Sequence, residues 1–459
     1  MIGTGVFTST GLQARELHDP ATILLAWVVG GVLALCGAAA YAELGAMMPE
    51  AGGEYVYLSR AYHPAVGFLS GWVSLTAGFS ASIAVSAIAF ATYLAKLVPA
   101  LDAQAAWLTA NLAVGDHHLC TITLGVHEVM AIGLIVGITA LHGFDTRLGG
   151  WIQAGFTGSK VLLILGFIVC AVTLGHGDWG NLRSQHGGLA NLTTPEFAMA
   201  LMYVSFAYSG WNAAAYIAGE VVRPERTLPR ALLVGTGVVM AVYVLLNLVV
   251  LYAVPSDTLA GGAGGPVLEV ADAAAHQLFG ARAAAAVTSV IALALVSGVS
   301  AMMIAGPRIY AAMAADGALP EPLRRYSRRG VPTVAVVAQG GLAIAFVLVG
   351  DLGQLIRLAG FMLAIFAALT VGAVFVLRRR GYRAPYRTFG YPVTPILFIA
   401  LSAWIAYVQV EAHLAESLVV LAVLALGGAL YRGLGGARRR SVAAPDALPE
   451  ARVVGDPQR

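Results

Sequence analysis

The feature that most constrains this chain is a series of apolar segments, each long enough to cross a lipid bilayer. A spanning helix needs about 20 apolar residues, because the hydrocarbon core is about 30 Å thick. We expect eleven such segments, at residues 21–48, 66–98, 126–143, 151–175, 196–219, 230–254, 284–313, 333–350, 354–377, 393–411 and 416–432. Only 11% of the 459 residues are Asp, Glu, Lys or Arg, whereas soluble domains carry about 25%. The sequence therefore predicts an all-α polytopic membrane protein.

Composition narrows the classes of partner. The 54 glycines suit close packing of membrane helices. A net charge of +3 gives no argument for a nucleic-acid partner. Three scattered cysteines, Cys36, Cys120 and Cys170, suit neither a disulfide framework nor a zinc site. We expect no cofactor and no structural metal, and the expected partners are the lipid bilayer and a small-molecule substrate.

Basic residues fall mainly on one side of the segments, as they do in the cytoplasmic loops of membrane proteins. If the first residues form the outer part of a partial first helix, the inner side holds Arg60, Arg147, Arg223, Arg226, Arg230, Arg324, Arg325, Arg328, Arg329, Arg378, Arg379, Arg380, Arg383, Arg387, Arg432, Arg438, Arg439, Arg440, Arg452 and Arg459. The outer side holds Arg15, Lys96, Arg183 and Arg282. We therefore expect a multi-pass protein of a bacterial plasma membrane with a cytoplasmic C-terminus.

Two segments contain residues that a plain spanning helix does not need. One is "IGTGVFTSTG" at the start, and the other is "SFAYSGWNAAAYIAGE", in which Ser209 and Gly210 fall near the bilayer midplane. Helix breaks at corresponding points of two halves indicate a transporter site, because unwound backbone is tolerated there only where it lines a cavity. The alternative is that the glycines only allow close helix packing.

Four stretches carry a family resemblance, and they occur in order from Met1 to about Arg432. They are "MIGTGVF", "YAELGAMMPEAGGEYVYLSRAYHPAVGFLSGW", "FAYSGWNAAAYIAGEVVRPERTLPRAL" and "GPRIYAAMAADGALP". Together they resemble amino acid permeases of the amino acid–polyamine–organocation (APC) superfamily, and the third resembles the L-type amino acid transporter branch. The resemblance implies an inverted repeat of five plus five helices followed by two more, as in the leucine-transporter (LeuT) fold.

The resemblance also implies a division of the chain. The transporter domain covers residues 1–432, with repeat one at about 1–175, repeat two at about 195–377 and the extra helices at about 393–432. Residues 433–459 are rich in Gly, Ala, Pro and Arg and are expected to form a disordered basic tail. In the resembling permeases the glycine motif lies halfway along the first helix. We therefore expect the natural protein to start before Met1, which the mass of the native protein would test.

The backbone of the two interrupted segments suits a zwitterion. Free N–H groups around Gly3, Thr4 and Gly5, at the positive end of the following helix, favour a carboxylate. Carbonyl groups from Phe206 to Ser209 favour an ammonium group. The predicted substrate-binding residues are Ile2, Gly3, Thr4, Gly5, Phe206, Ala207, Tyr208, Ser209, Gly210 and Asn212.

The side chains of the second interrupted segment bear on specificity. Phe206, Tyr208 and Trp211 are expected to wall a pocket or to pack in the core. By resemblance, Phe206 matches an aromatic gate and Asn212 a polar pocket residue. The interrupted segments carry no acidic side chain at the breaks, so a neutral amino acid fits better than a cationic amino acid or a polyamine.

Lys160 lies deep within an apolar segment, where an ammonium group needs a cavity or a partner. We expect its charge to replace a sodium ion between the first helix and the small polar stretch that contains Ser297 and Ser300. The resemblance agrees, because sodium-independent members carry a lysine in the fifth helix. The alternative is a buried structural pair. Whether Lys160 cycles a proton or stays charged is left open by the sequence.

Other polar residues give weaker predictions. His117, His118, His127 and Glu128 occur in an outer loop that we expect to be solvated rather than metal-binding. Cys120 lies in the loop through which eukaryotic relatives join a heavy-chain glycoprotein, but we expect no such partner here. Arg357, near the outer start of its helix, is expected to snorkel to the membrane surface.

The predicted function is secondary active transport of amino acids, neutral L-amino acids above others, by a sodium-independent symport or exchange. Enzyme activity is not expected, because the spans lack paired catalytic groups such as an H-E-x-x-H helix. The alternatives are a transporter of polyamines or cationic amino acids, and an amino acid sensor built on a transporter scaffold.

Overall fold

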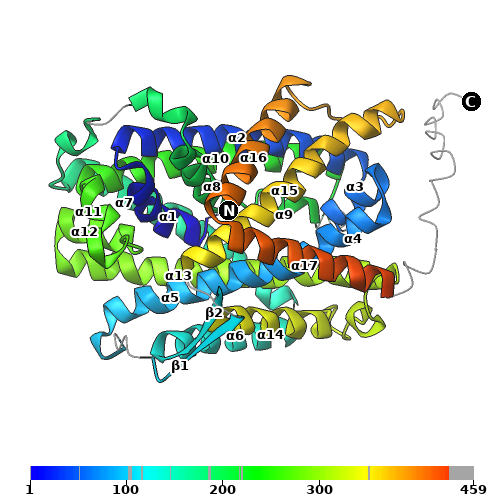
Figure 1. Ribbon diagram of the computed structural model, residues 1–459, viewed down its shortest axis with the longest axis horizontal. Helices are drawn as coiled ribbons and strands as arrows, with labels where there is room; N and C mark the ends of the chain where they lie inside the picture. Colours follow the sequence, from blue (N-terminus) through cyan, green and yellow to red (C-terminus); the bar gives the residue numbers. More distant parts are fainter. Residues whose placement is uncertain are drawn as a thin grey trace, which may run out of the picture.

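The apolar segments of the sequence form long helices that run across one another in a single bundle in the computed structural model (Figure 1). The structure describes residues 2–50, 52–101, 106–114, 117–144, 146–184, 188–216, 218, 221–349 and 352–433. Within this part of the chain, 8 helices are long and apolar enough to cross a membrane, and two more apolar helices are shorter. The prediction of an all-α polytopic membrane protein is therefore confirmed.

The long helices follow the predicted segments closely, and the structure adds shorter helices and two strands. The helices are α1 Thr4–Leu17, α2 Pro20–Met47, α3 Glu54–Ala61, α4 Pro64–Val73, α5 Ser82–Leu97, α6 Val126–Phe144, α7 Thr146–Leu174, α8 Pro195–Tyr208, α9 Ala213–Tyr216, α10 Pro224–Ala253, α11 Ser256–Ala260, α12 Val270–Phe279, α13 Ala281–Ala315, α14 Thr333–Val349, α15 Leu352–Arg379, α16 Val393–Ala412 and α17 Leu414–Gly433. The strands are β1 Leu108–Val114 and β2 His117–Leu124.

Proline and a capping side chain begin several helices. Pro20 opens α2 after Asp19, whose carboxylate accepts a hydrogen bond from the backbone N–H of Thr22 at 2.9 Å. Proline costs nothing at this position, because the first N–H groups of a helix have no partner within it. The segment predicted at residues 230–254 corresponds to α10, which begins earlier, at Pro224, and includes Pro229.

The segment predicted at residues 66–98 is not one regular helix. Between α4 and α5 the backbone forms π-helical turns over Ser74–Ala81. Such wider turns occur mostly at functional sites, because they displace the groups on one helix face. Here they bring Ser74, Gly78 and Phe79 to the wall of the cavity described below.

The outer loop between α5 and α6 contains two β-strands that were not predicted from the sequence. Strands β1 and β2 pair antiparallel, with an irregularity between Leu112 and Ala113. The hairpin lies beside α6 and α14 at one edge of the bundle (Figure 1). Thr121 and Thr123 alternate with Ile122 and Leu124 in β2, and this pattern of β-branched and apolar residues favours a strand.

Helix packing joins the two halves of the chain. Helix α1 packs on α8, α2 on α10, α5 on α13, and α6 on α14. Each of these pairs takes one helix from residues 1–175 and one from residues 195–377. Helices α16 and α17 pack against α15 and against each other, and they also contact α2 and α4 respectively.

Two ion pairs tie helix ends to distant parts of the bundle. Glu43 of α2 accepts hydrogen bonds from Arg378 of α15 at 2.7 Å and from the backbone N–H of Thr388 at 2.7 Å. Arg357 of α15 donates to Glu416 of α17 at 2.6 Å, so Arg357 is held within the protein. The sequence did not predict this partner, because Glu416 lies on a different helix, 59 residues away along the chain.

Candidate substrate-binding site

Helix α8 ends in the middle of an apolar segment. Its last residue is Tyr208, and the backbone then turns extended at Ser209 (ψ 157°) and left-handed at Gly210 (φ 90°). Helical winding resumes at Ala213 in α9. The interruption predicted at Ser209 and Gly210 is confirmed. Glycine suits this turn, because a side chain is strained at a positive φ.

Helix α1 presents its uncapped N-terminus near the same point. It begins at Thr4, and Gly3 before it has an extended backbone and makes no side-chain cap. The first N–H groups of a helix have no partner within the helix, and the helix dipole makes this end positive. The start of α1 can therefore receive an anionic group.

The two interrupted segments touch each other. A Cβ atom on Gly5 would lie 2.3 Å from the Cα atom of Ala207 in α8, so only glycine fits at this crossing. The hydroxyl of Thr4 donates a hydrogen bond to Ser86 of α5 at 2.7 Å. These contacts fix the start of α1 against both α8 and α5.

A cavity of about 380 Å³ lies where these elements meet. All ten predicted substrate-binding residues line it, namely Ile2, Gly3, Thr4, Gly5, Phe206, Ala207, Tyr208, Ser209, Gly210 and Asn212. The other walls come from α2, from the π-helical turns, and from α13, α15 and α16. The cavity has room for a molecule of amino-acid size, and residues at the start of α1 and at the end of α8 both line it.

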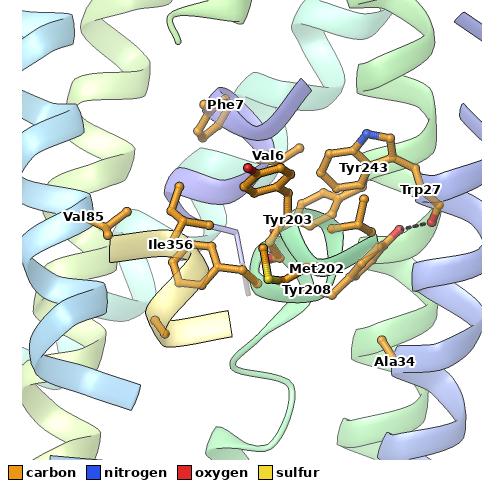
Figure 2. Close-up of a cluster of buried hydrophobic side chains, with 14 of the residues drawn as sticks. Val6, Phe7, Trp27, Ala34, Val85, Met202, Tyr203, Tyr208, Tyr243 and Ile356 are labelled. Atoms are coloured by element: carbon orange, nitrogen blue, oxygen red, sulfur yellow. Dashed lines mark hydrogen bonds between the residues drawn. The ribbon is translucent and has the colours of Figure 1, made fainter. Parts of the chain in front are cut away.

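A cluster of aromatic rings supports the end of α8 (Figure 2). The hydroxyl of Tyr208 donates a hydrogen bond to the carbonyl oxygen of Trp27 at 3.1 Å. The Tyr243 ring lies 5.0 Å from the Tyr208 ring and 5.5 Å from the Trp27 ring, and its hydroxyl donates to the carbonyl oxygen of Ala207 at 3.3 Å. Figure 2 shows these rings gathered beside Tyr203. The cluster holds the last turn of α8 in place.

Lys160 of α7 also reaches the cavity. Its side chain is 7% exposed, and its Nζ donates a hydrogen bond to the backbone carbonyl oxygen of Ile2 at 3.0 Å. In the part of the chain that the structure describes, no carboxylate forms an ion pair with it. The ammonium group therefore lies beside the start of α1, where it adds positive charge to the helix N-terminus.

The two serines predicted to form an ion site with Lys160, Ser297 and Ser300, lie on α13. Ser300 is buried, and its hydroxyl contacts the Nε2 atom of His142 in α6 at 2.8 Å. Ser297 is fully buried, and its hydroxyl has no hydrogen-bond partner among the described residues. Neither serine lines the cavity, whereas their neighbours Gly298 and Ala301 do.

Sequence reasoning missed an acidic residue of the cavity wall. Glu54, the first residue of α3, is 3% exposed and lines the cavity. Its carboxylate accepts hydrogen bonds from Tyr41 of α2 at 2.5 Å and from Asn212 at 2.8 Å. An available signal was its position directly after Gly52 and Gly53, because such a pair turns the chain sharply between two spans.

The weaker sequence candidates come from the loop before α6 and from its first turn. The side chains of His117, His118 and Cys120 lie outside the described residues. His127 and Glu128 lie at the start of α6. The described residues contain no group of three His, Cys, Asp or Glu side chains that could hold a metal ion.

Comparison with known proteins agrees with this geometry. Residues 1–427 match the model of the amino acid permease family. The chain is 29% identical to the serine/threonine exchanger SteT of Bacillus subtilis (strain 168), over 88% of this chain and 86% of that protein. It is 26% identical to the human b(0,+)-type amino acid transporter 1, over 94% and 84%, and 27% identical to the human large neutral amino acids transporter small subunit 2, over 94% and 77%. The chain therefore belongs to the amino acid permease family.

Proposed function

We propose that this protein is a secondary transporter that moves amino acids across a membrane by alternating access. The observation that carries this proposal is that the N-terminus of α1 and the interrupted end of α8 meet at one cavity within a bundle of membrane-spanning helices. Transporters place their substrates at such breaks, because unwound backbone supplies binding groups without burying unsatisfied ones in lipid. The named relatives are amino acid transporters or exchangers, which supports the same conclusion.

The proposed binding mode assigns one end of the substrate to each helix. The N–H groups at the start of α1 bind the α-carboxylate, with the Lys160 ammonium nearby. Carbonyl groups at the end of α8 bind the α-ammonium group, since the helix C-terminus carries the negative end of the dipole. The substrate side chain then extends into the rest of the cavity, between the π-helical turns and α15.

We propose neutral L-amino acids as the substrates. Glu54 is the acidic side chain among the described lining residues, and its Oε1 atom already accepts hydrogen bonds from Tyr41 and Asn212. A cationic side chain would have to compete with these donors. The names of two relatives specify serine and threonine or large neutral amino acids, which supports a neutral substrate over a polyamine.

Coupling is proposed to be independent of sodium. The Lys160 ammonium occupies the side of the cavity beside α1, where it can supply the positive charge that a bound cation would supply. Ser297 and Ser300 were predicted as part of the same ion site but are not among the residues that line the cavity, so we propose Lys160 as the residue that carries the coupling role. Transport then proceeds by exchange or with a proton.

The wider organisation is part of the proposal. The pairing of α1, α2, α5 and α6 with α8, α10, α13 and α14 supports two five-helix repeats followed by two extra helices. The basic inner loops support a cytoplasmic C-terminus in a bacterial plasma membrane, with residues 433–459 as a tail outside the described residues. We propose transport without enzyme activity and without a heavy-chain partner.

Uptake into proteoliposomes tests this function. The full chain is reconstituted and given the twenty labelled L-amino acids in turn, with and without a sodium gradient and with unlabelled amino acid inside. We expect saturable uptake of neutral amino acids that does not depend on sodium. Absence of uptake together with retained amino acid binding would instead indicate a sensor.

The Lys160→Ala variant tests the coupling role within the same assay. We expect at least about a tenfold loss of uptake, because removing a charged hydrogen-bonding partner from a buried site costs about 1.5–3 kcal/mol. Lys96→Ala is the matched control, since Lys96 is exposed at the end of α5. Unchanged uptake by Lys160→Ala would remove the coupling role while leaving the transport function standing.

A further inference from the structure

The carboxylate of Glu54 joins four separate elements at the cavity wall. It accepts hydrogen bonds from Tyr41 of α2 and Asn212 of the interrupted segment, and Ser70 of α4 approaches its second oxygen at 3.4 Å. The hydroxyl of Tyr216 in α9 also interacts with it. All of these partners are uncharged donors, so the carboxylate acts as an acceptor for each of them.

The side chain of Asn212 is held by this arrangement. Its Nδ2 atom carries two hydrogens, one directed to Glu54 at 2.8 Å and one to the hydroxyl oxygen of Tyr216 at 2.9 Å. An ionised carboxylate can only accept hydrogen bonds, so the nitrogen of the amide, and not its oxygen, must face Glu54. The Oδ1 atom is then the polar atom of Asn212 that remains for a ligand in the cavity.

The backbone before Glu54 fixes the Glu54 side of its contact with Asn212. Gly52 and Gly53 adopt positive φ angles of 117° and 49° immediately before Glu54. The N–H of Gly52 donates to the carbonyl oxygen of Tyr216 at 3.3 Å, and a Cβ atom on Gly53 would lie 2.3 Å from the Tyr216 ring. The glycine turn therefore packs directly on α9 and sets the position of the Glu54 carboxylate.

We propose that Glu54 is a positioning residue: its carboxylate orients the Asn212 amide so that Asn212 offers only a hydrogen-bond acceptor to the substrate. This inference rests on the proposed transport function and adds a specificity rule to it. Substrates with a donor group near Asn212, such as the α-ammonium group or a side-chain hydroxyl, are favoured. An analogue that has only hydrogen-bond acceptors at that point is rejected, because its acceptor and the Oδ1 atom of Asn212 would both be left without a donor.

Four variants of the full chain, reconstituted in proteoliposomes, test the inference. The probe is the labelled L-amino acid that the wild type takes up fastest. Glu54→Gln keeps the size of the side chain, but its amide can donate as well as accept, so Asn212 is free to turn over. We expect the KM of Glu54→Gln to rise about tenfold and kcat to stay within about twofold of the wild type. The reason is that the variant loses one charge-assisted hydrogen bond, the one that orients the Asn212 amide.

Conservative and compensating changes distinguish positioning from a structural role. Glu54→Asp keeps the acceptor-only carboxylate and should raise KM less than Glu54→Gln does. In the double variant Glu54→Gln with Asn212→Asp, the introduced amide donates to one oxygen of the introduced carboxylate and the other oxygen faces the cavity, so KM should recover toward the wild type. Glu50→Gln is the control, because Glu50 precedes α3, pairs with Arg60 of that helix and is exposed.

The outcomes separate this inference from the proposed function. Absence of amino acid binding and uptake by the wild type would overturn the proposed function itself. A functional wild type with an unchanged KM in Glu54→Gln, or an equal loss of kcat in all Glu54 variants, would overturn only the positioning role. Thermal unfolding of each detergent-solubilised variant identifies any that fail to fold, and Glu54→Asp then carries the test.

Discussion

Single residues of this protein act through groups that the sequence does not place side by side. Asn212 is 158 residues from Glu54 along the chain and Tyr41 lies on a different helix, yet the Glu54 carboxylate joins them. Lys160 is recognisable from its depth in an apolar segment, but its contact with the carbonyl oxygen of Ile2 depends on how α7 lies against α1. The charge of each side chain is a sequence property, whereas its partner is a property of the fold.

The affinity for substrate is expected to depend on pH through Glu54. Burial raises the pKa of the Glu54 carboxyl above its ordinary value of 4.5, although hydrogen bonds from Tyr41 and Asn212 act in the opposite direction. As pH falls through this raised pKa the carboxyl gains a proton and can donate, and Asn212 loses its fixed orientation. The KM of the wild type should therefore rise on acidification and be constant at higher pH.

Uptake measured from neutral pH down to about pH 5 checks this dependence. The titratable groups that interact with Glu54 from the surrounding elements are Tyr41, Tyr57 and Tyr216. These tyrosines stay protonated throughout this range. The KM of Glu54→Gln should be flat with pH. An equal pH dependence in that variant would assign the effect to a different group.

At the scale of helices, one close crossing sets the geometry of the site. Gly5 of α1 lies so near Ala207 of α8 that no side chain fits between them. The sequence predicted both helix breaks from their Gly and Ser residues, and the break after Tyr208 is where it was expected. It did not predict the π-helical turns at Ser74–Ala81, because their residues have the composition of an ordinary apolar helix.

Substituting Gly5 by Ala should separate α1 from α8. The added Cβ would lie 2.3 Å from a backbone atom, and overpacking of this kind costs about 1–3 kcal/mol. We expect Gly5→Ala to lower the thermal unfolding temperature in detergent. We also expect it to reduce uptake more than a Gly→Ala change in α6 or α10 does. Gly235→Ala is the control, since its Cβ would meet no atom within 4 Å. Equal stability of the two variants would contradict the close crossing.

At the scale of the whole molecule, helices from the first and second halves of the chain pack in pairs, and three of these pairs, α1 with α8, α2 with α10 and α5 with α13, contribute residues to the cavity wall. The ion pairs Glu43–Arg378 and Arg357–Glu416 then tie α2 and α17 to α15. The wall of the cavity also includes residues from nearly the whole length of the chain, from Ile2 to Ile405. A substrate bound there contacts both halves at once, which is what alternating access requires of a central site.

The orientation of the molecule in the membrane gives a further prediction. Arginines predominate in the predicted inner loops, and basic residues are retained on the cytoplasmic side during insertion. Trypsin added to intact spheroplasts should leave an epitope fused after Arg459 uncut, whereas trypsin added to inverted membrane vesicles should remove it. Removal of the epitope in spheroplasts would reverse the proposed topology.

The sequence by itself determined the class of the protein, the approximate helices, the helix break after Tyr208 and the family, because these follow from apolar length, glycine chemistry and local motifs. Only the tertiary structure decided which side chains meet. It brought Glu54 into the cavity wall, paired Arg357 with Glu416, and left the buried Ser297 and Ser300 out of the cavity lining. The physical reason is that hydropathy and helix propensity act over a few turns of one helix, whereas a contact depends on the rotation and crossing of two helices that are distant in sequence.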